Sequence, residues 1–173
     1  MTKRRNLDFY ETPAYYVEQL IKRAGILPKS RVFEPCAGDG AIARHFSGCV
    51  TNDIDPARTA DFHYDATDCD LWDEAEWIGI NWIVSNPPFK QALEIVEMAT
   101  ACSVNVAMLL RISFLEPTKQ REQFLLKHPP DGLIYLPRYS FTGNGKSDMS
   151  TVAWMLWNCP LYPAIQVAPR FPA

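Results

Sequence analysis

The chain lacks the features that mark several classes of protein. In its 173 residues no apolar run reaches the roughly 18 residues of a membrane-spanning helix, so we expect no membrane segment. Its five cysteines are scattered without any Cys-x-x-Cys pair, so neither a metal site nor a disulfide framework is predicted. The N-terminal residues turn acidic and aromatic directly after Lys3-Arg4-Arg5, which is not the pattern of a secretory signal. We therefore expect a protein of the reducing cytoplasm.

The charge is small overall but unevenly distributed. A net charge of −3 argues against a protein that coats nucleic acid through bulk electrostatics. Residues 51–80 hold nine acidic residues and one basic residue, which leaves a net +5 on the rest of the chain. Basic residues gather in the segment 111–146. The sequence thus predicts one region that suits a small cation and another that suits a polyanion.

The order of apolar segments predicts one α/β domain over residues 1–173. A helix is expected after Thr12-Pro13, with Thr12 as its N-cap and Gly25 at its end. Further helices are predicted at 41–46, 89–102 and 118–127, and strands at 31–34, 49–53, 62–65, 81–85, 104–110, 132–136 and 151–157. These segments predict a seven-stranded, mostly parallel sheet with helices on both faces and an antiparallel hairpin at one edge. Four prolines in residues 159–173 predict an extended tail.

The first candidate site is the loop Glu34-Pro35-Cys36-Ala37-Gly38-Asp39-Gly40, between a strand and a helix-like segment. Gly38 and Gly40 would let the backbone approach a ligand closely, and in open α/β sheets ligands lie at the carboxyl ends of strands. The acids Glu34 and Asp39 would repel a dinucleotide phosphate, so this loop favours a ligand that carries a positive charge.

Two more acids follow expected strands further along the chain. Asp53 stands at the end of the second strand, where a carboxylate can accept hydrogen bonds from both hydroxyls of a ribose. Asp65, in Asp65-Ala66-Thr67-Asp68, could accept from an adenine amino group. Acids are common at strand ends, so no single one of these residues indicates a binding site. Their order and spacing along the chain are stronger evidence for a binding site than any one of them.

The sharpest signal is Ser85-Asn86-Pro87-Pro88-Phe89, where an apolar strand stops at Asn, two prolines and an aromatic residue. The prolines fix the chain direction and donate no backbone hydrogen bond. Asn86 Oδ1 and the Pro87 carbonyl can then act together as acceptors, and Phe89 offers a flat face. Such a set suits a planar ring with an exocyclic amino group.

Together these motifs resemble the S-adenosylmethionine-dependent amino-methyltransferases, above all the DNA N6-adenine methyltransferases whose cofactor motif precedes the catalytic one. The resemblance covers residues 8–158 and implies a Rossmann-like class I methyltransferase fold. It implies that S-adenosylmethionine is held by the following residues: Tyr10, Thr12, Pro13, the loop 34–40, Asp53, Ile54, Asp65, Ala66 and Asn86. The catalytic residues would be Asn86, Pro87, Pro88 and Phe89, and the acceptor would contact Phe89, Arg111, Arg138, Phe141 and Lys146.

The chain departs from this family in one respect, because only residues 159–173 follow the late hairpin, where relatives carry a target-recognition domain. We therefore expect adenine-N6 methylation of DNA with low sequence specificity, single-stranded or distorted DNA being a favoured substrate. The small form resembles phage-encoded enzymes, which implies a bacterial or phage-infected cytoplasm.

Several alternatives stay open. RNA N6-adenine and protein-glutamine methyltransferases share the catalytic tetrapeptide, although Phe89 in place of Tyr disfavours the glutamine enzymes. A cytosine-N4 enzyme would more often carry Ser in place of Asn86. A catalytically silent binding module with this fold and a nicotinamide-binding Rossmann protein belong to other classes. The intact motifs disfavour the first of these, and the incomplete glycine pattern disfavours the second.

Overall fold

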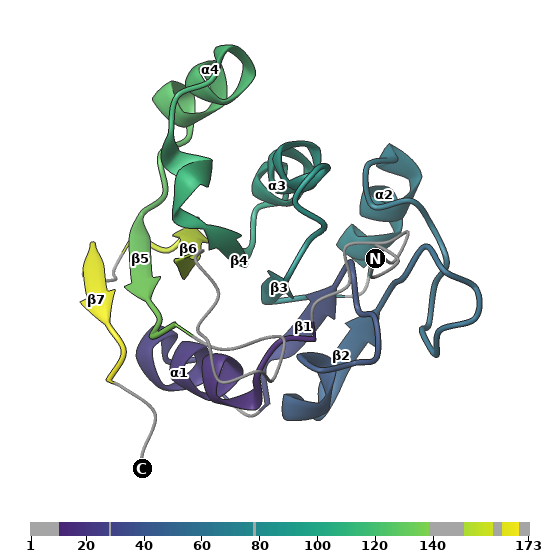
Figure 1. Ribbon diagram of the computed structural model, residues 1–173. Helices are drawn as coiled ribbons and strands as arrows, with labels where there is room; N and C mark the ends of the chain where they lie inside the picture. The colour runs from purple at the N-terminus through teal and green to yellow at the C-terminus, as the bar shows by residue number, and fades with distance from the viewer. Residues whose placement is uncertain (1–10, 28, 78, 139–150, 161–163, 170–173) are drawn as a thin grey trace, which may run out of the picture.

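Seven strands form one mixed sheet in the order β2-β1-β3-β4-β6-β5-β7 (Figure 1). The structure is a computed structural model that describes residues 11–27, 29–77, 79–138, 151–160 and 164–169. The strands are β1 (Arg31–Glu34), β2 (Gly48–Thr51), β3 (Trp82–Ser85), β4 (Asn105–Arg111), β5 (Gly132–Tyr135), β6 (Val152–Trp157) and β7 (Ile165–Val167). The helices are α1 (Ala14–Ala24), α2 (Cys69–Trp77), α3 (Ala92–Ala101) and α4 (Lys119–Lys127), with 3₁₀ turns η1 (Ala43–His45) and η2 (Ile112–Leu115).

Alternating residues of the central strands build a core on each face of the sheet. In β4, Ala107 and Leu109 face α1, whereas Val106, Met108 and Leu110 face the other side. That other side is covered by α2 and α3, so helices lie on both faces, as predicted (Figure 1). No helix in the described ranges is both long and apolar enough to cross a membrane.

The predicted antiparallel pairing is present, but β6 lies inside the sheet. It runs antiparallel to both β4 and β5, and it is the only antiparallel strand among those described. The edge beyond β5 is β7, which comes from the segment predicted to be an extended tail and pairs with β5 in parallel. Within the described residues the sheet therefore has the predicted seven strands, with β7 in place of the predicted strand 62–65.

Two segments were predicted wrongly, and one helix was not predicted. The segment 62–65 is not a strand of the sheet, because it makes only one bridge, between Asn52 and Phe62. Of residues 41–46, predicted to be helical, only Ala43–His45 form a short 3₁₀ turn. The acidic segment Cys69–Trp77, for which no helix was predicted, forms α2. Its Leu71 and Trp72 are buried against the sheet, and this packing explains a helix that the acidic composition does not suggest.

Helix α1 joins the beginning of the chain to its late strands. Trp154 donates a hydrogen bond from Nε1 to the Tyr16 carbonyl at 2.8 Å, and Tyr16 donates from its hydroxyl to the Pro137 carbonyl at 2.6 Å. The helix ends at Gly25 in the left-handed conformation, with φ of 64°, as its place in the sequence predicts. Its N-cap position is occupied by Pro13, and Thr12, predicted to be the cap, makes no capping hydrogen bond. The Thr12 hydroxyl instead accepts a hydrogen bond from Asn86 Nδ2.

Candidate active site

Most of the predicted site residues that the structure describes lie along one edge of the sheet. Strands β1 to β5 all run in the same direction, since β6 is antiparallel to both of its neighbours. Their carboxyl ends therefore lie along one edge, in the order β2, β1, β3, β4 and β5. The loop 34–40 follows β1, Asp53 follows β2, and Asn86 follows β3, so three motifs far apart in sequence occupy neighbouring positions.

The loop after β1 is shaped by its two glycines. Gly38 and Gly40 adopt φ angles of 55° and 71°, which side chains disfavour. Their N–H groups are used within the protein: Gly38 donates to Asp53 Oδ2 at 2.7 Å and Gly40 donates to the Ala37 carbonyl at 2.8 Å. The glycines therefore provide close backbone approach, and their amides are not unpaired donors for a ligand.

Glu34 is an almost fully buried acid at the end of β1. Its Oε2 accepts a hydrogen bond from the Ala43 amide at 2.8 Å. Burial raises the pKa of this carboxyl well above its ordinary value, and repulsion from nearby Asp53 raises it further. A cation placed near Glu34 and Asp53 would oppose both effects, so this end of the edge favours a positively charged ligand.

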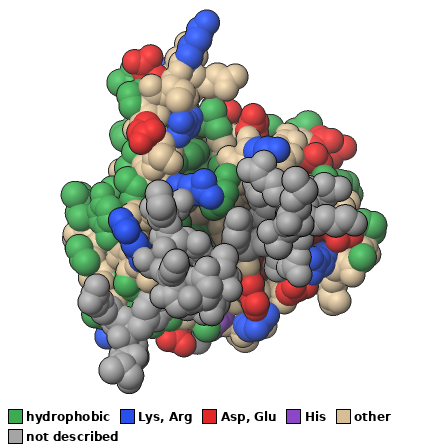
Figure 2. Space-filling model, in the orientation of Figure 1, with side chains coloured by type: hydrophobic (Ala, Val, Ile, Leu, Met, Phe, Trp, Pro, Cys, Tyr) green, Lys and Arg blue, Asp and Glu red, His purple; other side chains and the backbone are tan. Residues whose placement is uncertain are grey.

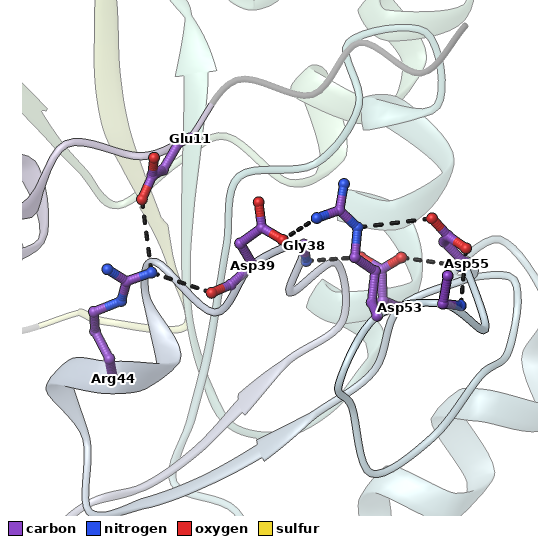
Figure 3. Close-up of polar contacts among 8 residues, drawn as sticks. Glu11, Gly38, Asp39, Arg44, Asp53 and Asp55 are labelled. Atoms are coloured by element: carbon purple, nitrogen blue, oxygen red, sulfur yellow. Dashed lines mark hydrogen bonds and ion pairs between the residues drawn. The ribbon is translucent and has the colours of Figure 1, made fainter. Parts of the chain in front are cut away.

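Asp53 is the residue through which two loops are joined (Figure 3). One carboxylate oxygen accepts from Gly38, and the other accepts from the Asp55 amide at 2.9 Å. A carboxylate oxygen has two lone pairs, so each can still accept from a ligand hydroxyl. Ile54, directly after Asp53, is 53% exposed, which leaves an apolar side chain available beside the carboxylate.

Asn52 is a site residue that sequence reasoning missed. Its side chain is fully buried and makes three hydrogen bonds: from Nδ2 to the carbonyls of Pro35 (2.9 Å) and Tyr64 (3.0 Å), and from the Tyr64 amide to Oδ1 (2.8 Å). It thereby holds together the glycine loop, the end of β2 and the segment that leads to Asp65. An Asn directly before the strand-end acid was the available signal, but the partners are remote in sequence.

The remaining acids are mostly satisfied locally. Asp65 Oδ1 accepts from the amide and hydroxyl of Thr67, and Ala66, beside it, is buried.

Asp39 forms an ion pair with Arg58, which also lies 3.7 Å from Asp55. Arg58 therefore balances part of the negative charge of Asp39, which the sequence analysis had assigned to a cationic ligand. The attraction for a cationic ligand depends mainly on Glu34 and Asp53. On the other side of the loop, Arg44 donates to the Asp39 carbonyl and pairs with Glu11 (Figure 3).

Cys36 is a partly buried cysteine in the loop after β1. Burial raises the pKa of its thiol to about 12, the hydroxyl of neighbouring Ser85 opposes the shift, and the charges of Asp53, Glu34 and Asp65 add to it. The thiol is therefore neutral near pH 7 and no nucleophile.

The segment Asn86-Pro87-Pro88-Phe89, predicted to be catalytic, follows β3 and contacts the residue that precedes Pro13 and α1. Asn86 donates from Nδ2 to Thr12 Oγ1 at 3.1 Å. Thr12 is itself buried. The contact joins two predicted site residues that lie 74 positions apart in the sequence. Pro87 is buried and Phe89 is half-buried.

Basic residues follow the strands on the other half of the edge. Arg111 ends β4, and its guanidinium carbon lies 3.9 Å from the centroid of the Phe89 ring. Lys90 and Arg138 are exposed after β3 and β5. Tyr10, Phe141 and Lys146 lie outside the described residues. The described edge thus carries acidic residues after β1 and β2 and basic residues after β3, β4 and β5.

Solved structures share this architecture at low sequence identity. No protein-family model and no curated protein matches the chain. A Listeria monocytogenes protein assigned to the class I S-adenosylmethionine-dependent methyltransferases matches 90% of the chain with a TM-score of 0.57 and 13% identity. The fold is that of the class I methyltransferases. A type I restriction-modification methyltransferase subunit from Streptococcus thermophilus matches 90% of the chain, with a TM-score of 0.63 and 12% identity.

The rRNA methyltransferase AviRa from Streptomyces viridochromogenes matches 91% of the chain, with a TM-score of 0.53 and 10% identity. The chain spans 62% and 46% of the first two proteins and 89% of AviRa. The similarity establishes the class I methyltransferase fold.

Proposed function

We propose that this chain is an S-adenosylmethionine-dependent methyltransferase that methylates N6 of adenine in DNA. The observation that supports it most directly is the position of Asn86. The Asn86-Pro87-Pro88-Phe89 segment follows β3, between the acid-containing loop after β1 and the basic end of β4. A cationic methyl donor and an anionic acceptor would therefore meet at the tetrapeptide.

The described residues fit S-adenosylmethionine. Glu34 and Asp53 favour its cationic end, Asp53 has lone pairs for the ribose hydroxyls, and exposed Ile54 offers an apolar surface to the adenine ring. Thr12 and Pro13, at the start of α1, lie beside Asn86. When bound, S-adenosylmethionine would supply an electrophilic methyl group on sulfur and leave as a neutral thioether.

The protein's task is to make the acceptor nitrogen nucleophilic. The lone pair of an adenine amino group is delocalised into the ring. Asn86 Oδ1 and the Pro87 carbonyl would accept its two hydrogens and favour a pyramidal nitrogen whose lone pair is directed at the methyl group. After the carbon–nitrogen bond forms, N6 loses a proton to solvent. Alignment of the two reactants supplies much of the remaining rate enhancement.

The choice of DNA rests on the resemblance of the tetrapeptide and on the basic half of the edge. Neighbours in fold include both a restriction-modification subunit and an rRNA methyltransferase, so the fold does not choose the nucleic acid. RNA N6-adenine methylation is the second candidate, and the same basic residues favour it. The acidic chain as a whole would limit binding to a small interface, for which we expect a short or degenerate sequence context.

The test is transfer of labelled methyl groups to DNA, RNA and protein, followed by identification of the modified nucleoside. N6-methyladenine in DNA is the expected product. Asn86→Ala should lower turnover about a hundredfold or more, as loss of an oriented hydrogen-bonding group does in other active sites. Asn81→Ala, at the opposite end of β3, is the matched control and should leave turnover unchanged. Equal turnover of the two variants would remove the tetrapeptide from catalysis.

A further inference from the structure

Arg111 and Phe89 form a stacked pair at the boundary of the basic half of the edge. They come from adjacent parallel strands, Arg111 from the end of β4 and Phe89 from the loop after β3. The guanidinium carbon lies 3.9 Å from the ring centroid, within the range of a cation–π contact. The pair therefore connects the catalytic loop to a cationic side chain.

This contact leaves the hydrogen-bonding capacity of Arg111 available. Stacking uses the flat face of the guanidinium, whereas its five N–H donors point outward in the plane. Arg111 is exposed, and within the described ranges it takes part in no ion pair and no side-chain hydrogen bond. Arg121, by contrast, donates to the Ser113 carbonyl and to Thr118 Oγ1, so it serves the local structure.

The surroundings favour an anionic partner for that guanidinium edge. In Figure 2, Lys and Arg side chains stand on α4 and on the surface beneath it, with Asp and Glu side chains among them on α4. Lys90 is exposed directly after Phe89, and Arg138 is exposed after β5. A phosphodiester oxygen pair matches the planar donors of arginine in a bidentate geometry.

We propose that Arg111 binds the phosphodiester next to the target adenine and, through its stacking contact, sets the orientation of Phe89. The inference rests on the proposed function. It assigns the positioning of the Phe89 ring to the substrate phosphodiester that Arg111 binds. A phosphate held by the N–H edge fixes the guanidinium plane, and that plane packs on Phe89. An adenine with a neighbouring phosphodiester should therefore be a better acceptor than free adenosine, beyond the gain from attraction alone.

The test compares Arg111→Ala and Arg111→Lys with Lys22→Ala, which removes an exposed charge from the last turn of α1. Binding of a fluorescent single-stranded oligonucleotide is measured by anisotropy over a range of salt concentrations. Arg111→Ala should weaken binding about tenfold, since it removes a charged hydrogen-bonding group. It should also reduce the slope of log affinity against log salt by about 0.7, the value for one phosphate on a single strand. Lys22→Ala should change neither quantity, and Arg111→Lys should keep the slope.

A second measurement tests the coupling to Phe89. Trinucleotides with one central adenine are compared with the same trinucleotides in which the flanking phosphodiesters are neutral methylphosphonates. The substitution should lower kcat/KM about tenfold in the wild type and leave Arg111→Ala nearly unaffected. Arg111→Lys should behave like Arg111→Ala in kcat despite its retained charge, because an ammonium does not stack as a planar fork.

Three results would overturn the proposal: equal salt slopes for Arg111→Ala and Lys22→Ala, an equal methylphosphonate effect with and without Arg111, or no oligonucleotide binding by the wild type. Thermal unfolding of each variant checks that the fold is retained, and Arg111→Lys serves if Arg111→Ala does not fold. Binding is measured without methyl transfer. A wild type that binds oligonucleotides but methylates none would therefore refute the proposed reaction while the salt slope still decides the role of Arg111.

Discussion

Replacement of Asn52 tests whether the candidate site is organised as described. Asn52→Ala removes three hydrogen bonds from a side chain that is fully buried. Each contributes about 1 kcal/mol, and the buried groups that remain unpaired add to the cost, so the free energy of unfolding should fall by about 3–5 kcal/mol. Cofactor affinity should fall as well, because the loop after β1 and the segment before Asp65 lose their common support.

The isosteric variant Asn52→Asp separates hydrogen bonding from packing. Its carboxylate would place an acceptor oxygen against the carbonyls of Pro35 and Tyr64, where Asn52 has a donor. Near pH 7 it should be at least as destabilised as Asn52→Ala. It should recover part of its stability as the pH falls, because the protonated acid can again donate to one carbonyl.

Urea unfolding at pH 7 and pH 5 measures both effects. Asn81→Ala is the control, because exposed Asn81 makes only one side-chain hydrogen bond within the described residues, from the Arg31 amide. We expect this variant to lose no more than about 1 kcal/mol. A loss below about 1 kcal/mol for Asn52→Ala, or a fully stable Asn52→Asp at pH 7, would refute the reasoning.

Three further predictions concern the same edge of the sheet. Thr12→Val removes the acceptor for Asn86 Nδ2 and should lower kcat about tenfold, whereas Thr12→Ser should restore it; equal rates for the two variants would contradict the role of the hydroxyl. Asp53→Ala should weaken S-adenosylmethionine binding by about 1.5–3 kcal/mol in calorimetry, and an unchanged affinity would exclude Asp53 from the site. The raised pKa of buried Glu34 means that the folded state holds this proton more tightly than the unfolded chain does. Stability should therefore fall as pH rises from the ordinary value of 4.5 through the folded-state pKa, and thermal unfolding of Glu34→Gln should lack that part of the decline.

The buried parts of the fold could be predicted from the sequence because burial leaves a clear pattern. The apolar segment of β4 is covered on both faces, and its boundaries were predicted to within one residue. The short segments were harder to predict. Phe62 and Tyr64 suit a strand by composition, yet only one bridge forms there, whereas Ile165 and Val167 lie between prolines and still add a strand to β5. Whether a three-residue segment pairs depends on the edge available to it, which local composition does not specify.

For the candidate site, the sequence indicated which residues follow strands but not how they contact one another. The strand ends at Glu34, Asp53 and Asn86 were predictable, and parallel pairing brings them to one edge. The contacts of Thr12 with Asn86 and of Arg111 with Phe89 join separate motifs, and spacing along the chain does not predict them. For Asp39 the sequence suggested a ligand-binding acid, and it did not indicate that Arg58 forms an ion pair with this residue.

The attachment of α1 to the late strands constrains when this protein can finish folding. The Tyr16 carbonyl accepts a hydrogen bond from Trp154, which is 138 residues later in the chain. The Tyr15 hydroxyl donates to the Pro169 carbonyl, 154 residues later. During synthesis on the ribosome, α1 and the free edge of β4 therefore cannot make these contacts until β6 has been made. The centre of the sheet is complete only when β6 pairs with both β4 and β5. Contacts between residues this far apart in sequence slow folding. During synthesis the strand most in need of protection from intermolecular pairing is β4, whose apolar edge has no partner until residues 152–157 emerge.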